Sequence, residues 1–542
     1  MKASRVYLLA FLLGPVVASA QRPAPGSDTV LKGSTIEVIQ SYKPRVKQSP
    51  KPEWKPQLPP VDTTHPSLTF DVPQQTLYYT YNSPPLRPLA LGKVAGELPY
   101  PNYIKAGGGN RSTAYVDAGI GGITGDNYET GLHLHHLSQK GSIINQQSSI
   151  TGMEAEGTLH NTTGDWHASV AAAHSRYHYY GYDHILHNYS ADAVRQTYTS
   201  VKIAADMASK PDTNSQLEYH PGISGSYYGA RYNTSEISIG LNAPVTYHLN
   251  DNVGLHLGLS AAITSYKADS ITTANNMLLA APGIKINIDD FSGHALAGFA
   301  LGKGGSTYFL PDLEVAYSMR DYLFRMSVGW QAKLRQNTYE QLTTENPYML
   351  STYQVIQTRT DEIYINAQGS LGNHFSYAAR GSWWNYFDLP TFLNDSGDQK
   401  AFYVLYQNVK ALSFQLSARY HMASKWSAGL TGELFSFYKS SDQHVWHEPA
   451  TRIKGDVAVA VTPKLDVTAY GFVLGGIHAR NTAFTAVTLK TIADIGIGAE
   501  YQIVPRLSAF VQINNLLNSK YQRWQGYEVY GFNIYGGLRL KF

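Results

Sequence analysis

The stretch LSFQLSARYHM (412–422) decides the fold class of this 542-residue chain. Apolar side chains stand at every second position, and polar or charged side chains stand between them. Side chains alternate between the two faces of a β-strand, so the stretch predicts a strand with one apolar and one polar face. The same alternation recurs in DIGIGAEYQI (494–503), VGLHLGLSAAI (253–263) and YLFRMSVGWQAKL (322–334). We therefore expect strands from about Tyr103 to the end of the chain.

A soluble β-sandwich also contains alternating strands and is the main alternative to a membrane barrel. The predicted strands are about 10 to 15 residues long, whereas strands of globular proteins usually have about five or six. The pattern also continues far beyond the size of a single sandwich domain. Both observations favour a barrel.

The connections between the predicted strands alternate between short and long. Short turns are expected at 319–321, 372–374, 423–425, 462–464 and 504–506. Long polar loops are expected at about 338–354, 386–402, 439–452, 479–490 and 516–528. Outer-membrane barrels have short periplasmic turns, longer outer loops and girdles of aromatic residues at both interfaces. Aromatic residues do gather near the long loops, in RYHYYGYD (176–183), WWNYF (383–387) and the series Tyr521, Trp524, Tyr527 and Tyr530.

These features predict an all-β fold, a transmembrane antiparallel β-barrel of about 22 strands, with a range of 20 to 24, over residues 102–542. The barrel must be closed, because an open sheet edge cannot lie in hydrocarbon. In the last strand, NIYGGLRLKF (533–542), Arg539 and Lys541 are expected to face the lumen while the alternate apolar residues face lipid. The predicted location is the bacterial outer membrane, and its lipid is one expected partner.

Composition excludes several classes of function. Charged residues make up 15% of the chain, against about 25% in ordinary globular proteins, and the net charge of +3 gives no argument for nucleic-acid binding. The chain has no Cys, which excludes disulfides, thiolate metal sites and Cys nucleophiles. No apolar run long enough for a transmembrane helix follows residue 20.

The first hundred residues differ from the rest. Residues 1–20 have a basic start, a short apolar run and the small-residue end Ala18-Ser19-Ala20, which together predict a signal peptide. Residues 21–101 are rich in Pro, notably at 43–66, and predict an extended periplasmic segment.

Candidate chemistry on the barrel is sparse. His133 and His135 lie on one predicted face, about 7 Å apart, and with His160 or His167 they are a weak candidate for a transition-metal site. Polar residues lining the lumen are the simpler interpretation of both histidines. No nucleophile motif such as G-x-S-x-G and no P-loop is found, so we expect neither an enzyme nor a bound cofactor.

The end of the chain resembles TonB-dependent receptors. The resemblance rests on a segment expected on the penultimate strand and on the final strand that ends at Phe542; the residues of the segment that fit are Asn515, Leu516, Leu517, Asn518, Lys520 and Tyr521. A terminal Phe of this kind resembles the assembly signal that the barrel assembly machinery reads. The family implies a 22-strand barrel and gated uptake. Its globular plug of well over a hundred residues has no counterpart here, so the chain resembles a plug-less relative in Gram-negative bacteria, in which Glu37-Val38-Ile39 and Tyr42-Lys43-Pro44 form a recurring segment.

One N-terminal segment bears on the energy source. Residues Ser34, Thr35, Ile36, Glu37, Val38 and Ile39 resemble a TonB box, which pairs with TonB by strand addition, although they also fit an extended linker. The resemblance implies transport or reception in the outer membrane, with the N-terminal segment as a minimal plug or a separate plug or periplasmic partner. The alternative is a non-transport scaffold of a secretion, motility or surface-protein complex, or a passive channel.

Overall fold

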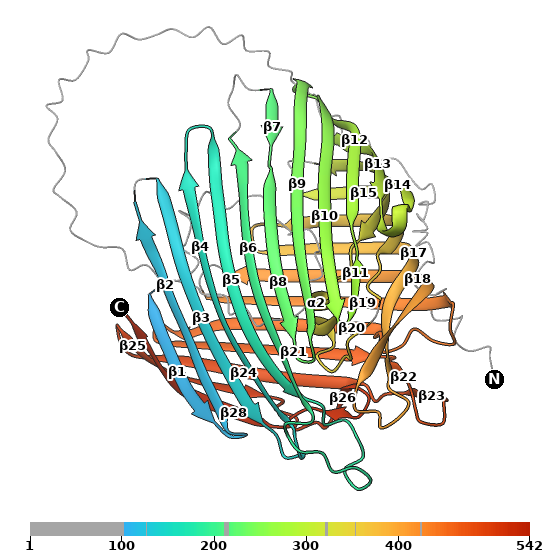
Figure 1. Ribbon diagram of the computed structural model, residues 1–542. Helices are drawn as coiled ribbons and strands as arrows, with labels where there is room; N and C mark the ends of the chain where they lie inside the picture. Colours follow the sequence, from blue (N-terminus) through green and yellow to red (C-terminus); the bar gives the residue numbers. More distant parts are fainter. Residues whose placement is uncertain (1–101, 126, 211–215, 320–322, 353, 423–424) are drawn as a thin grey trace, which may run out of the picture. The chain divides into compact units, whose positions relative to one another are not determined.

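A computed structural model describes residues 102–542, apart from 126, 211–215, 320–322, 353 and 423–424. These residues form one antiparallel sheet that closes on itself (Figure 1). Closure is direct, because the first strand, β1 (Tyr103–Gly109), pairs along its length with β2 (Thr113–Thr124) on one side and with the last strand, β28 (Asn533–Lys541), on the other. The described residues therefore form a closed barrel without an open sheet edge.

The sheet has 22 positions around the barrel. The first half contains β3 (Tyr128–Lys140), β4 (Gln147–His160), β5 (Gly164–His178), β6 (Arg195–Ser209), β8 (Gly222–Ala230), β9 (Thr234–Asn250), β10 (Val253–Ala268), β12 (Met277–Ile288) and β13 (Phe291–Leu301). The second half contains β14 (Thr307–Met319), β15 (Phe324–Arg335), β16 (Thr358–Leu371), β17 (Phe375–Asn394), β18 (Phe402–Met422), β19 (Trp426–Ser440), β20 (Thr451–Thr462), β21 (Leu465–Gly475), β24 (Ile492–Val504) and β25 (Leu507–Asn514). The short strands β7 (Leu217–Tyr219) and β11 (Ile271–Ala274) extend β8 and β12 along the same neighbours. The prediction of a barrel of about 22 strands is confirmed.

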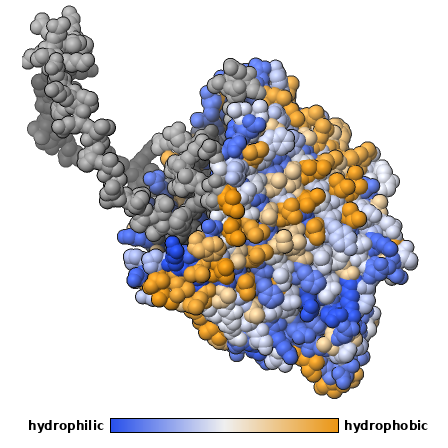
Figure 2. Space-filling model, turned by 60° about the vertical axis from the view of Figure 1, so that its left-hand side comes forward, coloured by the Kyte–Doolittle hydropathy of each residue, from blue (hydrophilic) through white to orange (hydrophobic). Residues whose placement is uncertain are grey.

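The two faces of the strands divide as the alternation predicts. Leu412, Phe414 and Leu416 on β18 are 50–51% exposed on the outer face. On β28, Leu538 and Leu540 also face outward, whereas Arg539 is 8% exposed and pairs with Glu500 at 3.2 Å on the inner face. Figure 2 shows apolar side chains gathered over the outer surface of the strands. The outer face is thus fit for hydrocarbon and the inner face for water.

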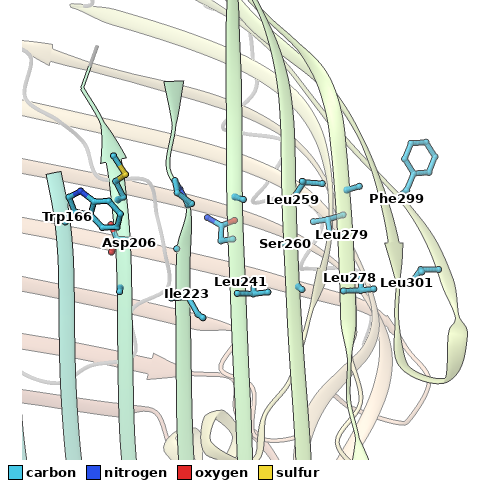
Figure 3. Close-up of a pocket in the computed structure, with 18 residues that line it drawn as sticks. Trp166, Asp206, Ile223, Leu241, Leu259, Ser260, Leu278, Leu279, Phe299 and Leu301 are labelled. Carbon is cyan, nitrogen blue, oxygen red and sulfur yellow. The ribbon is translucent and has the colours of Figure 1, made fainter. Parts of the chain in front are cut away.

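The outer face carries an apolar hollow of about 790 Å³ across β5 to β13 (Figure 3). Large side chains such as Ile223, Leu241 and Leu278 lie in register with the small Ala205 and Ala261, which leave the space between them. A hollow of this composition suits the acyl chains of a bilayer.

The connections differ at the two ends of the barrel. One end has turns such as 251–252, 289–290, 463–464 and 505–506, and the chain enters and leaves the barrel there. The other end carries the long connections 179–194, 336–357, 441–450, 476–491 and 515–532. These loops contain the helix α2 (Tyr339–Glu345) and the hairpins β22 (His478–Arg480) with β23 (Ala486–Thr488) and β26 (Gln522–Trp524) with β27 (Tyr527–Glu528). Among the described residues, no helix is both long and apolar enough to span a bilayer.

Two local predictions are wrong. β17 was expected to end at 386, but after a bulge at Tyr386–Leu389, with Asp388 at a φ of 55°, it continues to Asn394. Residues 390–394 are all buried, so they lack the alternation by which a strand is recognised. The segment from Asn515 to Tyr521 lies in the loop after the penultimate strand, not on it, because Asn515 and Asn518 have φ values of 48° and 47°.

Candidate functional site

Three long loops meet over the loop end of the barrel. Tyr180 comes from the connection between β5 and β6, Tyr348 from that between β15 and β16, and Tyr527 from that between β25 and β28. The rings of Tyr348 and Tyr527 stack with centroids 3.7 Å apart, and Tyr180 meets both edge-on, at 4.8 Å from Tyr527 and 5.8 Å from Tyr348. Since these loops start from strands six to eight positions apart around the barrel, the contact spans the mouth. We call the packed loops the tyrosine lid.

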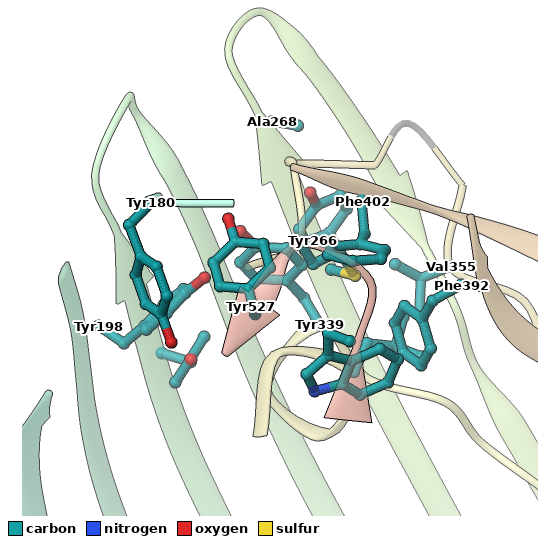
Figure 4. Close-up of a cluster of buried hydrophobic side chains, with 13 residues drawn as sticks. Tyr180, Tyr198, Tyr266, Ala268, Tyr339, Val355, Phe392, Phe402 and Tyr527 are labelled. Atoms are coloured by element: carbon teal, nitrogen blue, oxygen red, sulfur yellow. The ribbon is translucent and has the colours of Figure 1, made fainter. Parts of the chain in front are cut away.

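The lid has the burial of a protein core. Its loops pack with residues of β6, β8, β10, β17 and β18 into one cluster, which comprises Tyr180, Tyr198, Tyr228, Tyr266, Ala268, Tyr339, Leu342, Met349, Val355, Phe392, Phe402, Trp524 and Tyr527 (Figure 4). Tyr339, Met349, Val355 and Phe402 are completely buried. Aromatic contacts of this kind add to the free energy of burying apolar surface. The loops therefore form a specific packed structure across the mouth.

The helix α2 attaches the lid to the barrel wall. Thr338 caps the helix by accepting a hydrogen bond from the Gln341 backbone N–H at 3.1 Å. Glu236 on β9 accepts from the Tyr339 backbone N–H at 2.6 Å. Tyr228 on β8 bonds to Thr343 at 2.6 Å, and Tyr198 on β6 donates to a backbone carbonyl just beyond the helix. The inner faces of β6 to β10 thus form the seat of the helix.

The extended hairpin of β17 and β18 forms another part of the lid. Phe392 and Phe402 pack against Trp524 with ring centroids 5.2 and 5.6 Å away. His447, from the connection between β19 and β20, contacts the rings of Phe402 and Trp524 with centroids 5.2 and 5.3 Å away and is 1% exposed. Its Nδ1–H donates to the Phe392 carbonyl at 2.7 Å, and its Nε2 accepts from the Gln525 backbone N–H at 3.4 Å. Burial lowers the pKa of His447 to about 3, so the closed lid contains a neutral imidazole.

Backbone contact between two loops requires glycine at one point. Gly526 has a φ of 87°, and a Cβ at this position would lie 2.5 Å from the Gly181 carbonyl oxygen. Tyr180 also donates to the Glu528 carbonyl at 2.8 Å, and Tyr527 donates to the Lys400 carbonyl. Main-chain and side-chain contacts therefore hold the same loops together.

A group of charged side chains adjoins His447. Arg452 pairs with Glu448 at 2.6 Å and with Glu433 at 3.2 Å, and the Arg523 guanidinium donates to the His447 carbonyl. Burial, and next the charge of Glu448, raise the pKa of Glu345 to about 7. The raised pKa of Glu345 stabilises the closed lid at low pH, whereas the lowered pKa of His447 stabilises it at higher pH.

The sequence-predicted histidines are not brought together as one site. His133 pairs with Asp117 at 3.0 Å on the lumen wall, and His135 stacks on it with a centroid distance of 5.7 Å. His160 and His167 pair with other carboxylates. On β4, the residue opposite His133 is Glu154, and His160 lies six residues further along that strand, or about 20 Å away. Within the described part of the chain, no group of three His, Cys, Asp or Glu residues could hold a metal ion.

The remaining predicted site residues lie elsewhere. Ser34–Ile39, with the signal peptide 1–20 and the segment 21–101, lies outside the described residues. Phe542 is 58% exposed at the end of the closing strand. The sequence does not predict the lid, because the tyrosines of RYHYYGYD and of the Tyr521–Tyr530 series fit an interfacial girdle equally well. Of the quoted aromatic runs, Trp383 does face outward, where it donates to Tyr438 at 2.5 Å, whereas Tyr180, Trp524 and Tyr527 are buried in the lid.

The fold is similar to solved outer-membrane transporters and receptors. The FrpB iron transporter (F3-3 variant) from Neisseria meningitidis is 11% identical, with a TM-score of 0.63 over 83% of this chain and 82% of that chain. The siderophore receptor PirA from Acinetobacter baumannii is 11% identical, with a TM-score of 0.62 over 83% and 81%. The pyoverdine outer membrane receptor FpvA from Pseudomonas aeruginosa PAO1, solved with pyoverdine bound, is 10% identical, with a TM-score of 0.62 over 82% and 78%. Neither a family model nor a curated protein sequence matches the chain.

At these identities the likeness concerns the fold, which is the barrel of TonB-dependent receptors that the resemblance implied. A closed barrel with an apolar outer face and a polar inner face satisfies its backbone hydrogen bonds internally, as a bilayer demands. The chain is accordingly an outer-membrane protein.

Proposed function

We propose that this protein is a gated outer-membrane receptor or transporter of the TonB-dependent type, in which the tyrosine lid closes the outer mouth of the barrel. The observation that carries the proposal is the meeting of Tyr180, Tyr348 and Tyr527 across the mouth. A passive channel needs an open path for water, whereas these loops bury their rings against one another. The lid therefore has to rearrange before a solute can enter.

The width of the barrel supports the same conclusion. Barrels of 22 strands enclose a lumen that transporters keep plugged, since an open one would abolish the permeability barrier. In our proposal the lid closes the outer side, and the Pro-rich segment 21–101 fills the periplasmic side as a minimal plug. Ser34–Ile39 would then be the point at which TonB delivers energy, by strand addition.

The lid can be tested in the intact protein. The double replacement Tyr348→Ala and Tyr527→Ala removes the stacked pair at the mouth, while the strands of the barrel wall stay unchanged. We expect cells that make this variant to become more sensitive to bulky antibiotics that the outer membrane normally excludes, and the purified variant to show a larger conductance in planar bilayers. Tyr438→Ala, on the outer face, is the matched control and should change neither property.

Locking the lid gives the opposite test. Because the chain has no Cys, Tyr348→Cys and Tyr527→Cys would supply its only two thiols, which a short bifunctional thiol reagent can join. We expect the linked Cys variant to have a lower permeability and conductance than the same variant before linking, opposite to the effect of the double Ala variant. If neither opening nor locking the loops changes permeability or conductance, the lid is not a gate, and a scaffold role in a surface complex becomes the better explanation.

A further inference from the structure

The outer face of β3 to β6 changes character in regular steps toward the loop end. Cross-strand neighbours form four successive rows, namely Leu134, Met153, Ala172 and Val201; His136, Thr151, His174 and Thr199; Ser138, Ser149, Arg176 and Thr197; and Lys140, Gln147, His178 and Arg195. The first row is apolar and the last two are rich in cations and hydroxyls. Four residues separate Ala172 from Arg176, or about 13 Å along β5. This is the step from hydrocarbon to headgroups in the outer leaflet.

A polar pocket of about 410 Å³ lies at the upper rows. Lys140, Gln147, Ser149, Arg176 and Arg195 all contribute to its lining. Asp192 from the loop above also lines it and carries the pocket's negative charge, but this carboxylate is already paired with Arg195 at 2.8 Å and with Arg231 at 3.0 Å. The pocket therefore keeps an excess of positive charge.

Two cations of the pocket are unused by the fold. The side chains of Lys140 and Arg176 have no ion-pair or hydrogen-bond partner among the residues that the structure describes. The charge of Arg176 instead adds to those of Arg195 and Arg231 around the His178 ring. Asp192 is the one carboxylate among the lining residues that the structure describes, so repulsion between the cations is only partly neutralised, and an anionic ligand would relieve the rest.

We propose that this pocket binds the phosphorylated sugar headgroup of an outer-leaflet glycolipid, whose acyl chains lie on the apolar rows below. Arg176 and Lys140 bind phosphate, since guanidinium and ammonium groups are the usual protein donors to phosphate oxygens. Ser149 and Gln147 are placed to hydrogen-bond sugar hydroxyls. Lys140 and Arg195 stand three interstrand spacings apart, about 14 Å, which is wider than one phosphate and suits a disaccharide.

Continuity with the lipid-facing surface favours a lipid over a soluble anion. The row of His136 and His174 lies directly between the apolar row of Met153 and Val201 and the pocket, and both histidines bond to threonines across the strands, at 2.7 and 3.0 Å. A free phosphate would use only the upper rows. A glycolipid uses the whole face.

The experiment measures retention of lipid A by the full-length protein in detergent, using native mass spectrometry. Wild-type protein should retain bisphosphorylated lipid A, and the Lys140→Gln/Arg176→Gln variant should bind it about tenfold or more weakly. Removing these unpaired cations leaves the ion pairs of the fold intact. Lys410→Gln is the matched control, because Lys410 lies on the outer face of β18, over the Trp383 ring, far from the pocket; it should bind as wild type does.

Each other outcome overturns the proposal. Equal retention by wild type and the double variant would show that these cations do not recognise the lipid. An equal loss of lipid A retention in Lys410→Gln would show that retention depends on the total charge of the protein and not on this pocket. If lipid A without phosphates binds as well as the phosphorylated form, only acyl chains are recognised. If millimolar inorganic phosphate displaces the lipid, the pocket is a site for a free anion.

Discussion

His447 makes the lid sensitive to acid through a single proton. The ring uses both nitrogens in its neutral form, donating to the Phe392 carbonyl and accepting from the Gln525 backbone N–H. The pKa of His447 in the closed lid is about 3, whereas in an opened lid it is about 6.5. The open state therefore binds the proton more tightly, and the closed lid loses stability as the pH falls below about 6.5.

We expect acidification to loosen the lid through this residue. Each pH unit below about 6.5 costs the closed lid about 1.4 kcal/mol, so about 2 kcal/mol is lost by pH 5. Amide hydrogen exchange in 441–450 and 515–532, compared at each pH with His447→Gln, measures the effect. Gln keeps a donor and an acceptor but does not titrate. Equal pH dependence in both proteins would contradict the role of His447.

Glu345 acts in the opposite direction and is the reason for that comparison. Its raised pKa means that the closed lid binds this proton more tightly, so its contribution to stability is present at low pH and is lost as the pH rises toward 7. The side chain is partly exposed, so solvent screens part of the effect. Since Glu345 is present in both wild type and His447→Gln, its contribution cancels.

At the scale of the element, each barrel strand works as a boundary between two solvents. Leu416 on β18 faces lipid and is 50% exposed, while its neighbour Gln415 faces the lumen, opposite Arg380 and Glu433. The same alternation of lipid-facing and lumen-facing residues repeats on the other strands, and most strands pair with the strands before and after them along the chain. Antiparallel hairpins need only short connections, so most of the pairing is between neighbours along the chain.

Placing a cation on the two faces should separate them. Arg at the bilayer midplane on the lipid face of a barrel costs roughly 2–4 kcal/mol, whereas the lumen face is hydrated. We expect Leu416→Arg to reduce the heat-modifiable, folded barrel strongly and Gln415→Arg to reduce it little. Gly498 is unsuitable as a lumen position, because a Cβ there would lie 2.6 Å from the Gln512 side chain. Equal loss in the two Arg variants would mean that the faces are wrongly assigned.

The end of β28 is the second element that can be tested. Phe542 extends the outward row of Leu538 and Leu540, and its backbone N–H donates to the Asn102 carbonyl at 3.2 Å, beside the closing pair of β1 and β28. Deleting Phe542, or replacing it with Asp, should lower the amount in the outer membrane and raise periplasmic degradation. Ile534→Ala, on the same face but remote from the terminus, serves as the control. Normal abundance without Phe542 would remove its role as an assembly signal.

At the scale of the whole molecule, the proposed function places the control of passage at two ends of the barrel. The outer mouth has the tyrosine lid, and the periplasmic side is where the chain enters β1 from the segment 21–101. In the proposed function, the energy that opens the path is delivered by TonB at the segment Ser34–Ile39.

The dependence on TonB can be tested without touching the barrel. Pro has no N–H to donate and breaks strand addition. Ile36→Pro or Val38→Pro should therefore abolish cross-linking to TonB and any energy-dependent uptake, while barrel assembly stays normal. Gln40→Pro, just beyond the segment, provides the control. Absence of any contact between TonB and the wild-type protein would exclude the energised mechanism while leaving the lid in place.

The sequence by itself determined most of the strands and their two faces, through residue alternation, and the closed barrel and its membrane, through strand length and the alternation of short and long connections. The faces can be predicted because successive side chains of a strand point to opposite faces, so lipid-facing and lumen-facing residues alternate along the chain. The two histidines His133 and His135 were likewise placed on one lumen face. Tertiary structure alone decided the lid. Tyr180, Tyr348 and Tyr527 are separated by more than a hundred residues, and a tyrosine beside a loop suits an interface girdle as well as a buried contact. Only the closure of the barrel brings their loops to the same mouth, and no local pattern encodes that meeting.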